Sequence, residues 1–435
     1  MFYKNYFKYI IPSMIAFTLT GIYSIVDGYF IGQTVGDTGL AAVNLAWPVA
    51  AVTYAIGTGL GMGGSVVSSI RRGEGDTLNA EKAIGVSFSL IISAAVIVTL
   101  LIYSSADILI TLMGAEGLTK EFAVIYLRTL ALGAAAQIGG CGLMPIIRSF
   151  GRPVLAMASM VTGCIVNIVL DWYFVMILNW GVRGAGLATI LGEAVTAVPF
   201  VIFFLLKSNR IPLSYIRFKL KVMKEIIKIG VSPFGLSILP SVAILLVNLQ
   251  ALRLGGNTAV AAFAVISYVL SIIQLMIQGI SEGAQPILSF NTGAGKKDIV
   301  RKTASLTFSI NILTGALGAV LLVLFCEEIA FLYNTGKSTT AMLISTMPIF
   351  AATAPLYGFS RTAADFLYAI NRPYSASLMV YSEGLLFMPL LLFILPSFFD
   401  LTGVWAAPIT TQCILLIMGV FLLTRKNDIK KTHTP

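Results

Sequence analysis

The sequence has 435 residues, of which 57% are hydrophobic and only 11% are charged. Because soluble domains carry roughly a quarter charged residues, this composition excludes an ordinary soluble protein and indicates an integral membrane protein. The net charge of +10 would suggest a nucleic-acid partner on a soluble domain. In a membrane protein, basic loops and attraction to anionic lipid account for it, so we expect membrane lipid and no nucleic acid as a partner.

Apolar segments near or above the roughly 20 residues that a membrane-crossing helix requires recur along the whole chain. We expect about twelve of them and therefore an all-α fold of 12 transmembrane helices. The expected spans are residues 10–32, 42–68, 83–106, 121–145, 154–178, 184–206, 226–252, 259–288, 303–325, 342–368, 374–396 and 402–424.

The two halves of the chain are related by an offset of 220 residues. Residues 36–75 align without a gap on residues 256–295, with ten of forty positions identical, and the segment 151–153 (Gly-Arg-Pro) falls on 371–373 (Asn-Arg-Pro). Six spans in each half mean that both halves enter the membrane in the same direction. This pattern is typical of secondary transporters whose substrate site lies between two tandem repeats.

The repeat and the spans together predict the domain organisation. We expect an N-terminal six-helix lobe at 1–206, a cytoplasmic basic linker at 207–225, a C-terminal six-helix lobe at 226–424 and a cytoplasmic tail at 425–435. The linker is expected to lie as an amphipathic stretch on the inner leaflet.

Basic residues are distributed very unequally between the two sides of the predicted topology. One side holds 23 of the 29 lysines and arginines, and the other holds four, whereas Arg128 and Arg361 fall inside predicted spans. Because basic loops are retained in the cytoplasm, we expect a multi-pass protein of the cell (inner) membrane with both termini cytoplasmic.

Cysteine and histidine offer no chemistry of their own. The four cysteines are scattered without metal or redox spacing, and the single histidine, His433, lies in the tail. This excludes a zinc site, a histidine-based triad and an intramembrane histidine relay. We therefore expect no enzyme activity and no cofactor.

Carboxylates within the predicted spans are the strongest functional signal. Each costs a few kcal/mol at the centre of a membrane helix, so each is by default a functional candidate. The six are Asp27, Asp171, Glu193, Glu282, Asp365 and Glu383.

The amino-terminal half carries the most informative group of polar residues. Asp27 has no basic residue within two helical turns, and Asn167 and Asp171 are four apart, hence on one face of the fifth span. Thr189 in the sixth span adds a hydroxyl. Such an oxygen cluster coordinates a hard cation such as Na⁺ or holds a proton; the alternative is that these side chains only bridge helices by hydrogen bonds.

The other intramembrane acids have simpler explanations available. Arg361 and Asp365 are four apart and favour an intrahelical ion pair. Glu282 has no basic neighbour in the sequence and either attracts a cationic substrate or only lines a water-filled cavity. Glu193 and Glu383 are weaker candidates, because a position near a span end would explain them. We expect Glu282, Asp365 and Glu193 to face a substrate cavity.

Taken together, these motifs resemble the MATE family of multidrug and toxic compound extrusion proteins, in particular its bacterial members. The likeness covers nearly the whole chain and includes Asp27 fifteen residues after Pro12, NIVLD at 167–171, the paired 151–153 and 371–373 connections, and QGISEGAQPILSFNTGAGK at 278–296.

The resemblance implies two six-helix bundles around a V-shaped central cavity, and export of organic cations driven by inward Na⁺ or H⁺. It implies a cation site at Asp27, Asn167, Asp171 and Thr189, with Tyr126 as a further member, and Na⁺ as a metal ion that the first three residues would hold. Some members also carry an essential acid in the tenth span, which here falls near Phe359 or Ser360 rather than on Asp365.

The favoured function is therefore a monomeric antiporter that moves small organic cations by alternating access of the two lobes. A flippase for a lipid-linked headgroup is the nearest alternative, but it would need several basic residues in the cavity. An intramembrane aspartyl protease using Asp27 and Asp171 lacks the Gly-x-Gly-Asp context at both positions. A channel is a third alternative. Its flux would not saturate, whereas the flux of a carrier does.

Overall fold

The computed structural model describes residues 2–206 and 211–425 of the chain, and its elements there are helices. Ten helices of the described residues are long and apolar enough to cross a membrane. One of the ten, α7 (Leu220–Gly293), is two spans joined at a break where Gly256 adopts φ 61° and ψ −160°. With α1 (Phe2–Thr34), these make the twelve predicted membrane-length segments.

The amino-terminal lobe consists of six long helices. Its fifth helix continues into a π-helical turn, η1, directly after Asp171. After α1, the elements are α2 (Gly36–Gly73), α3 (Thr77–Leu112), α4 (Gly117–Ser149), α5 (Pro153–Asp171), η1 (Trp172–Ile177) and α6 (Gly181–Leu205).

The carboxyl-terminal lobe repeats this arrangement with more interruptions. Its fifth span also contains a π-helical turn, η3, which begins at Glu383. After α7, the elements are α8 (Lys297–Leu324), α9 (Cys326–Leu332), α10 (Lys337–Ala351), α11 (Thr353–Ala369), α12 (Pro373–Ser382), η3 (Glu383–Phe387), α13 (Met388–Ile394) and α14 (Pro396–Thr424).

The connection between the lobes, predicted at residues 207–225, is described only in part. Residues 207–210 lie outside the described residues, as do His433 and nearly all of the tail. The part that follows contains only the short 3₁₀ turn η2 (Leu213–Tyr215), and the backbone of Tyr215 packs against α3 at Gly85. The helix α7 begins at Leu220, six residues before the predicted start of the carboxyl-terminal lobe at 226.

The two lobes dock through α1 and α2 on one side and the two halves of α7 on the other. The docking is pseudo-symmetric: Ser65 and Gln285, which are 220 positions apart, meet across the interface, and Ser65 Oγ donates to Gln285 Oε1 at 3.1 Å. The backbones of α2 and α7 also touch, since a Cβ at Gly230 would lie 2.3 Å from the carbonyl oxygen of Gly59. Only glycine permits this approach.

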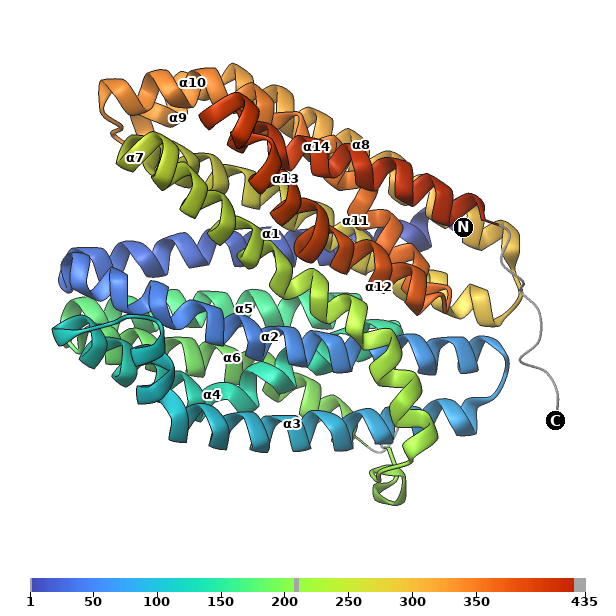
Figure 1. The fold of residues 1–435 in the computed structure, drawn as a ribbon. Helices are drawn as coiled ribbons and strands as arrows, with labels where there is room; N and C mark the ends of the chain where they lie inside the picture. Colours follow the sequence, from blue (N-terminus) through green and yellow to red (C-terminus); the bar gives the residue numbers. More distant parts are fainter. Residues whose placement is uncertain (1, 207–210, 426–435) are drawn as a thin grey trace.

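The polar contacts between the lobes gather toward one end of the molecule. Arg71 pairs with Glu225 at 2.5 Å, and the hydroxyls of Tyr6 and Thr307 are 3.0 Å apart. Figure 1 shows the α2–α3 and α7–α8 connections at this end together with the N-terminus, whereas the α1–α2 and α9–α10 connections lie at the opposite end of their lobes. Among the described residues, no hydrogen bond or ion pair joins the lobes at that opposite end.

Candidate functional site: two clusters of buried charge

The carboxyl groups of Asp27 on α1 and Asp171 at the end of α5 interact directly with each other. Asp171 is fully buried, and Asn167 lies one helical turn before it and is 3% exposed. The predicted stacking of Asn167 and Asp171 on one face of a helix is therefore present, and the first and fifth spans bring their acids to one point.

These two carboxylates have almost no protein groups to balance them. Both oxygens of Asp171 and Oδ1 of Asp27 lack a hydrogen-bond partner among the described residues, and so do both polar side-chain atoms of Asn167. The ion pairs found in the described residues involve neither aspartate. Adjacent buried carboxylates repel each other when both are ionised, so this cluster requires a bound cation or a proton.

Two hydroxyl groups complete the surroundings of the acid pair. Tyr126 on α4 lies close to both Asp27 and Asp171, and its hydroxyl shares a hydrogen bond with Thr189 on α6. Thr189 Oγ1 donates to the carbonyl of Ala185 at 3.0 Å. The structure thus brings together the five residues that the sequence and the resemblance indicated, from α1, α4, α5 and α6. We refer to them as the amino-lobe oxygen cluster: Asp27, Tyr126, Asn167, Asp171 and Thr189.

Glu193 lies one turn beyond Thr189 on α6, at a small cavity of about 20 Å³ between α2, α4 and α6. Thr189 and Gln137 line the same cavity. Tyr23 on α1 interacts with both Glu193 and Asp27. Glu193 is therefore close to the amino-lobe oxygen cluster, within the amino-terminal lobe, rather than facing the other lobe.

Glu282 occupies a different environment from the one expected. Its Oε2 accepts a hydrogen bond from Arg148 Nη2 at 2.8 Å, and its Oε1 accepts from Arg361 Nη2 at 3.3 Å and from Gln278 Nε2 at 2.8 Å. The sequence around Glu282, which holds no basic neighbour, did not indicate these partners, because the two arginines come from α4 and α11, far from it in the chain.

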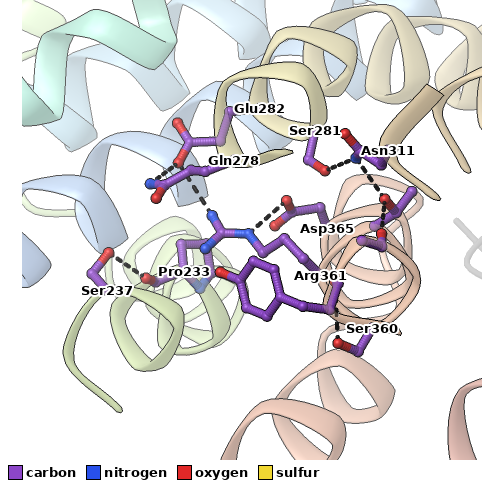
Figure 2. Close-up of polar contacts among 12 residues, drawn as sticks. Pro233, Ser237, Gln278, Ser281, Glu282, Asn311, Ser360, Arg361 and Asp365 are labelled. Atoms are coloured by element: carbon purple, nitrogen blue, oxygen red, sulfur yellow. Dashed lines mark hydrogen bonds and ion pairs between the residues drawn. The ribbon is translucent and has the colours of Figure 1, made fainter. Parts of the chain in front are cut away.

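Arg361 also pairs with Asp365, whose Oδ2 accepts from Nε at 3.0 Å. Figure 2 shows the Arg361 guanidinium between Glu282 and Asp365. The intrahelical pair is the one that the spacing predicted. Both acids are at most 2% exposed and bound to guanidinium groups, so their charges are compensated within the protein in the described conformation. The four residues Arg148, Glu282, Arg361 and Asp365 form a charge network of zero net charge.

Arg148 is the residue that sequence reasoning missed. The topology assigned it to a cytoplasmic connection, yet it is 1% exposed and lies inside α4. The available signal was its position directly after the apolar pair Ile146 and Ile147, before the helix ends at Ser149. Arg128, by contrast, is exposed and lies 5.9 Å from the Tyr103 ring.

Comparison with known proteins agrees with this architecture. The sequence model of the family MatE matches residues 12–173 and 235–391, one segment in each lobe. The chain is 29% identical over 430 residues to the multidrug export protein MepA of Staphylococcus saprophyticus, which covers 97% of this chain and 94% of that protein.

Solved structures give the same result for the fold. A MOP superfamily transporter from Pyrococcus furiosus superposes with a TM-score of 0.90 at 25% identity, covering 97% of this chain and 95% of that one. A MATE protein crystallised in complex with MaL6 superposes with a TM-score of 0.91 at 25% identity, covering 97% and 96%. The chain therefore belongs to the MatE family, and it is a multi-pass membrane transporter rather than an enzyme.

Proposed function

We propose that this protein is a secondary antiporter that exports organic cations in exchange for inward Na⁺ or H⁺, by alternating access of its two lobes. The observation that carries the proposal is the pairing of Asp27 with Asp171, two acids without a balancing base among the described residues. The name of the relative from S. saprophyticus, multidrug export protein MepA, supports drug-like cargo.

The amino-lobe oxygen cluster is suited to take up one cation at a time. Carboxylate, amide and hydroxyl oxygens are hard ligands for Na⁺, and a proton shared by the two carboxylates removes the same repulsion. Either cation relieves the repulsion between the two carboxylates, and this relief favours binding of the cation. Release into the cytoplasm then restores the repulsion and resets the site.

The basic loops orient the structure in the membrane. By the positive-inside rule we assign the docked end of the lobes to the cytoplasmic side, so in this proposal the described conformation is the one closed toward the cytoplasm. To reach the inward-open state, the lobes must separate at this end. The Arg148–Glu282 ion pair and the Gly59–Gly230 contact lie in that interface and must both break.

The membrane potential can drive this cycle only if net charge moves. One elementary charge moving inward across 100 mV releases about 2.3 kcal/mol, which supports a gradient of roughly fifty-fold for a neutral substrate. A one-for-one exchange of Na⁺ or H⁺ for a monovalent organic cation moves no net charge, and then only the gradient of the coupling ion contributes.

A lipid-linked headgroup is a less suitable cargo. Pyrophosphate recognition needs unpaired basic groups, whereas the buried guanidinium groups of Arg148 and Arg361 are bound to Glu282 and Asp365 in the described structure.

Uptake of a fluorescent cation such as ethidium into inverted vesicles tests the proposal. Na⁺ and H⁺ gradients are imposed separately on wild type, Asp27→Asn and Asp171→Asn, with Asp107→Asn as the matched control, because Asp107 is a surface acid paired with Lys120. We expect gradient-driven uptake in wild type and control and loss of at least tenfold in the other two. Unchanged uptake in both cluster variants would refute the proposal.

A further inference from the structure

The carboxyl-terminal lobe contains a cavity of about 130 Å³, which is separated from the amino-lobe oxygen cluster and reaches the charge network only through Tyr357, a lining residue next to Arg361. Its walls come from α7, α10, α11, α12, η3, α13 and α14 and are mainly apolar, with the aromatic side chains of Phe263, Phe350 and Tyr357 among them. Glu383 is the only charged residue among the described residues that line it. A single acid in an apolar, partly aromatic cavity is the arrangement that a hydrophobic cation requires.

The carboxylate of Glu383 is held in place by polar neighbours and not by a base. Gln412 Nε2 donates to Glu383 Oε1 at 2.7 Å, and Ser360 Oγ donates to Gln412 Oε1 at 2.7 Å. Ser360 thus fixes which end of the Gln412 amide faces the acid. In the described part of the chain, no lysine or arginine forms an ion pair with Glu383, because the nearby Arg361 is bound to Glu282 and Asp365.

The internal repeat indicates that this pocket is a specific feature of one lobe. The position equivalent to Glu383, ten residues after the paired 151–153 and 371–373 connections, is Gly163, and a Cβ at Gly163 would lie 2.6 Å from the carbonyl oxygen of Gly192 on α6. In the amino-terminal lobe, α5 and α6 therefore touch through their backbones. In the carboxyl-terminal lobe, two long polar side chains separate the corresponding helices and bind each other.

The converse holds for the amino-lobe oxygen cluster. The positions equivalent to Asp27, Asn167 and Asp171 are occupied by Val247, Phe387 and Leu391, which carry no oxygen in their side chains. The two lobes thus place acids at different sites. One is a compact group of oxygens, and the other is a lone carboxylate among hydrocarbon and aromatic surfaces.

We propose that the carboxyl-lobe cavity binds the ammonium end of an amphipathic organic cation, with Glu383 as its counter-ion. An apolar protein cavity of about 150 Å³ accommodates benzene, so 130 Å³ suits one aromatic ring or a small quaternary ammonium group. The rest of a larger cargo molecule would extend from the cavity. This assignment rests on the proposed cation export, but its test needs binding alone and no transport.

Trp405 offers a direct reporter of binding. Its ring lies 6.2 Å from that of Phe263 and 5.8 Å from that of Phe350, measured between centroids, and both phenylalanines line the cavity. The full-length protein with its other three tryptophans replaced by phenylalanine (Trp47, Trp172 and Trp180) is titrated in detergent with benzyltrimethylammonium. The uncharged isostere neopentylbenzene is titrated in parallel.

We expect a saturable change of Trp405 fluorescence with the cation and binding at least about tenfold weaker for neopentylbenzene, since a charge-assisted contact is lost. Glu383→Gln should weaken cation binding by at least about tenfold, and it retains an oxygen that accepts from Gln412. Ala243→Phe, which fills the cavity from α7, should abolish binding of both probes. Glu193→Gln, the glutamate of the amino-terminal lobe, is the matched control and should bind as wild type does.

Any one of three results would overturn the inference. Wild type and Glu383→Gln could bind the cation with equal affinity, wild type could bind both probes with equal affinity, or wild type could show no saturable binding. Asp27→Asn separates it from the proposed function. That variant should lose coupled uptake and keep the fluorescence response, so a failure of coupling and a failure of this pocket give different results.

Discussion

Arg148 and Glu282 join the two lobes through a buried ion pair of 2.8 Å, with side chains that are 2% and 3% exposed. Arg148 belongs to α4 of the amino-terminal lobe and Glu282 to the second half of α7. The other two guanidinium nitrogens of Arg148, Nε and Nη1, have no hydrogen-bond partner among the described residues. Glu282 is therefore the main compensation for this arginine, and any movement that parts the lobes here exposes both charges or requires water to solvate them.

Removal of one partner should destabilise the protein more than removal of both. Arg148→Met leaves the network with an unbalanced negative charge, and breaking a buried pair in this way costs about 3–5 kcal/mol. In the double variant Arg148→Met with Glu282→Gln, Arg361 and Asp365 still neutralise each other, so we expect recovery of most of the stability. Thermal unfolding in detergent measures this. A double variant no more stable than Arg148→Met would show that the pair is not coupled.

The backbone contact between Gly59 and Gly230 should tolerate no side chain on either helix. A Cβ at Gly230 would meet the Gly59 carbonyl at 2.3 Å, so Gly230→Ala forces α2 and α7 apart and should cost about 1–3 kcal/mol through overpacking. Gly139→Ala is the matched control, because a Cβ there has nothing within 4 Å and alanine favours the helix by up to about 1 kcal/mol. Equal unfolding temperatures for the two variants would contradict a close lobe contact.

The start of α3 is stabilised by a cap that the equivalent helix of the other lobe lacks. Asp76 accepts hydrogen bonds from the Asn79 backbone at 3.1 Å and from Asn79 Nδ2 at 2.8 Å, whereas Lys296, 220 positions later, provides no side-chain cap for α8. We expect Asp76→Ala to cost about 1 kcal/mol in the first turn of α3, and Lys296→Asp to slow amide exchange in the first turn of α8.

The same cap predicts a dependence on pH. The hydrogen bonds from Asn79 lower the pKa of Asp76, so the ionised form is the one that the folded state favours. The stabilisation is present above the pKa of the unfolded chain, near 3.9, and is lost as the pH falls through the lowered folded value. Hydrogen exchange of the first turn of α3, corrected for the intrinsic rate, should rise with acid in wild type and stay flat in Asp76→Ala. A flat wild-type profile would contradict this.

Much of the architecture could be predicted because it depends on local pattern. The twelve spans follow from hydropathy and length, the two lobes follow from the repeat, and the shared face of Asn167 and Asp171 follows from a spacing of four on one helix. The ion pair of Arg361 and Asp365 was predictable for the same reason.

The contacts that sequence reasoning missed depend on docking between distant helices. Arg148 and Glu282 are 134 positions apart, and nothing near either residue indicates the other. A position near a span end was the expected explanation of Glu383. Its place at a cavity was not predictable, because it depends on contacts between distant segments, such as the hydrogen bond from Gln412 on α14 to Glu383 at the start of η3. Periodicity gives the face of a helix, but it does not say which helix covers that face or how closely.

A bound coupling cation should stabilise the folded protein through the amino-lobe oxygen cluster. A ligand at 100 times its dissociation constant raises the free energy of unfolding by about 2.7 kcal/mol. For Na⁺, the unfolding temperature in detergent should rise when N-methylglucamine chloride is exchanged for NaCl at constant ionic strength. For H⁺, the same rise should appear on acidification, because protonation relieves the repulsion between Asp27 and Asp171. Asp171→Asn should abolish the response, since the amide removes that repulsion, and Asp107→Asn should keep it, because Asp107 lies outside the cluster and pairs with Lys120. An identical response to both ions in wild type and Asp171→Asn would mean that the coupling cation binds elsewhere.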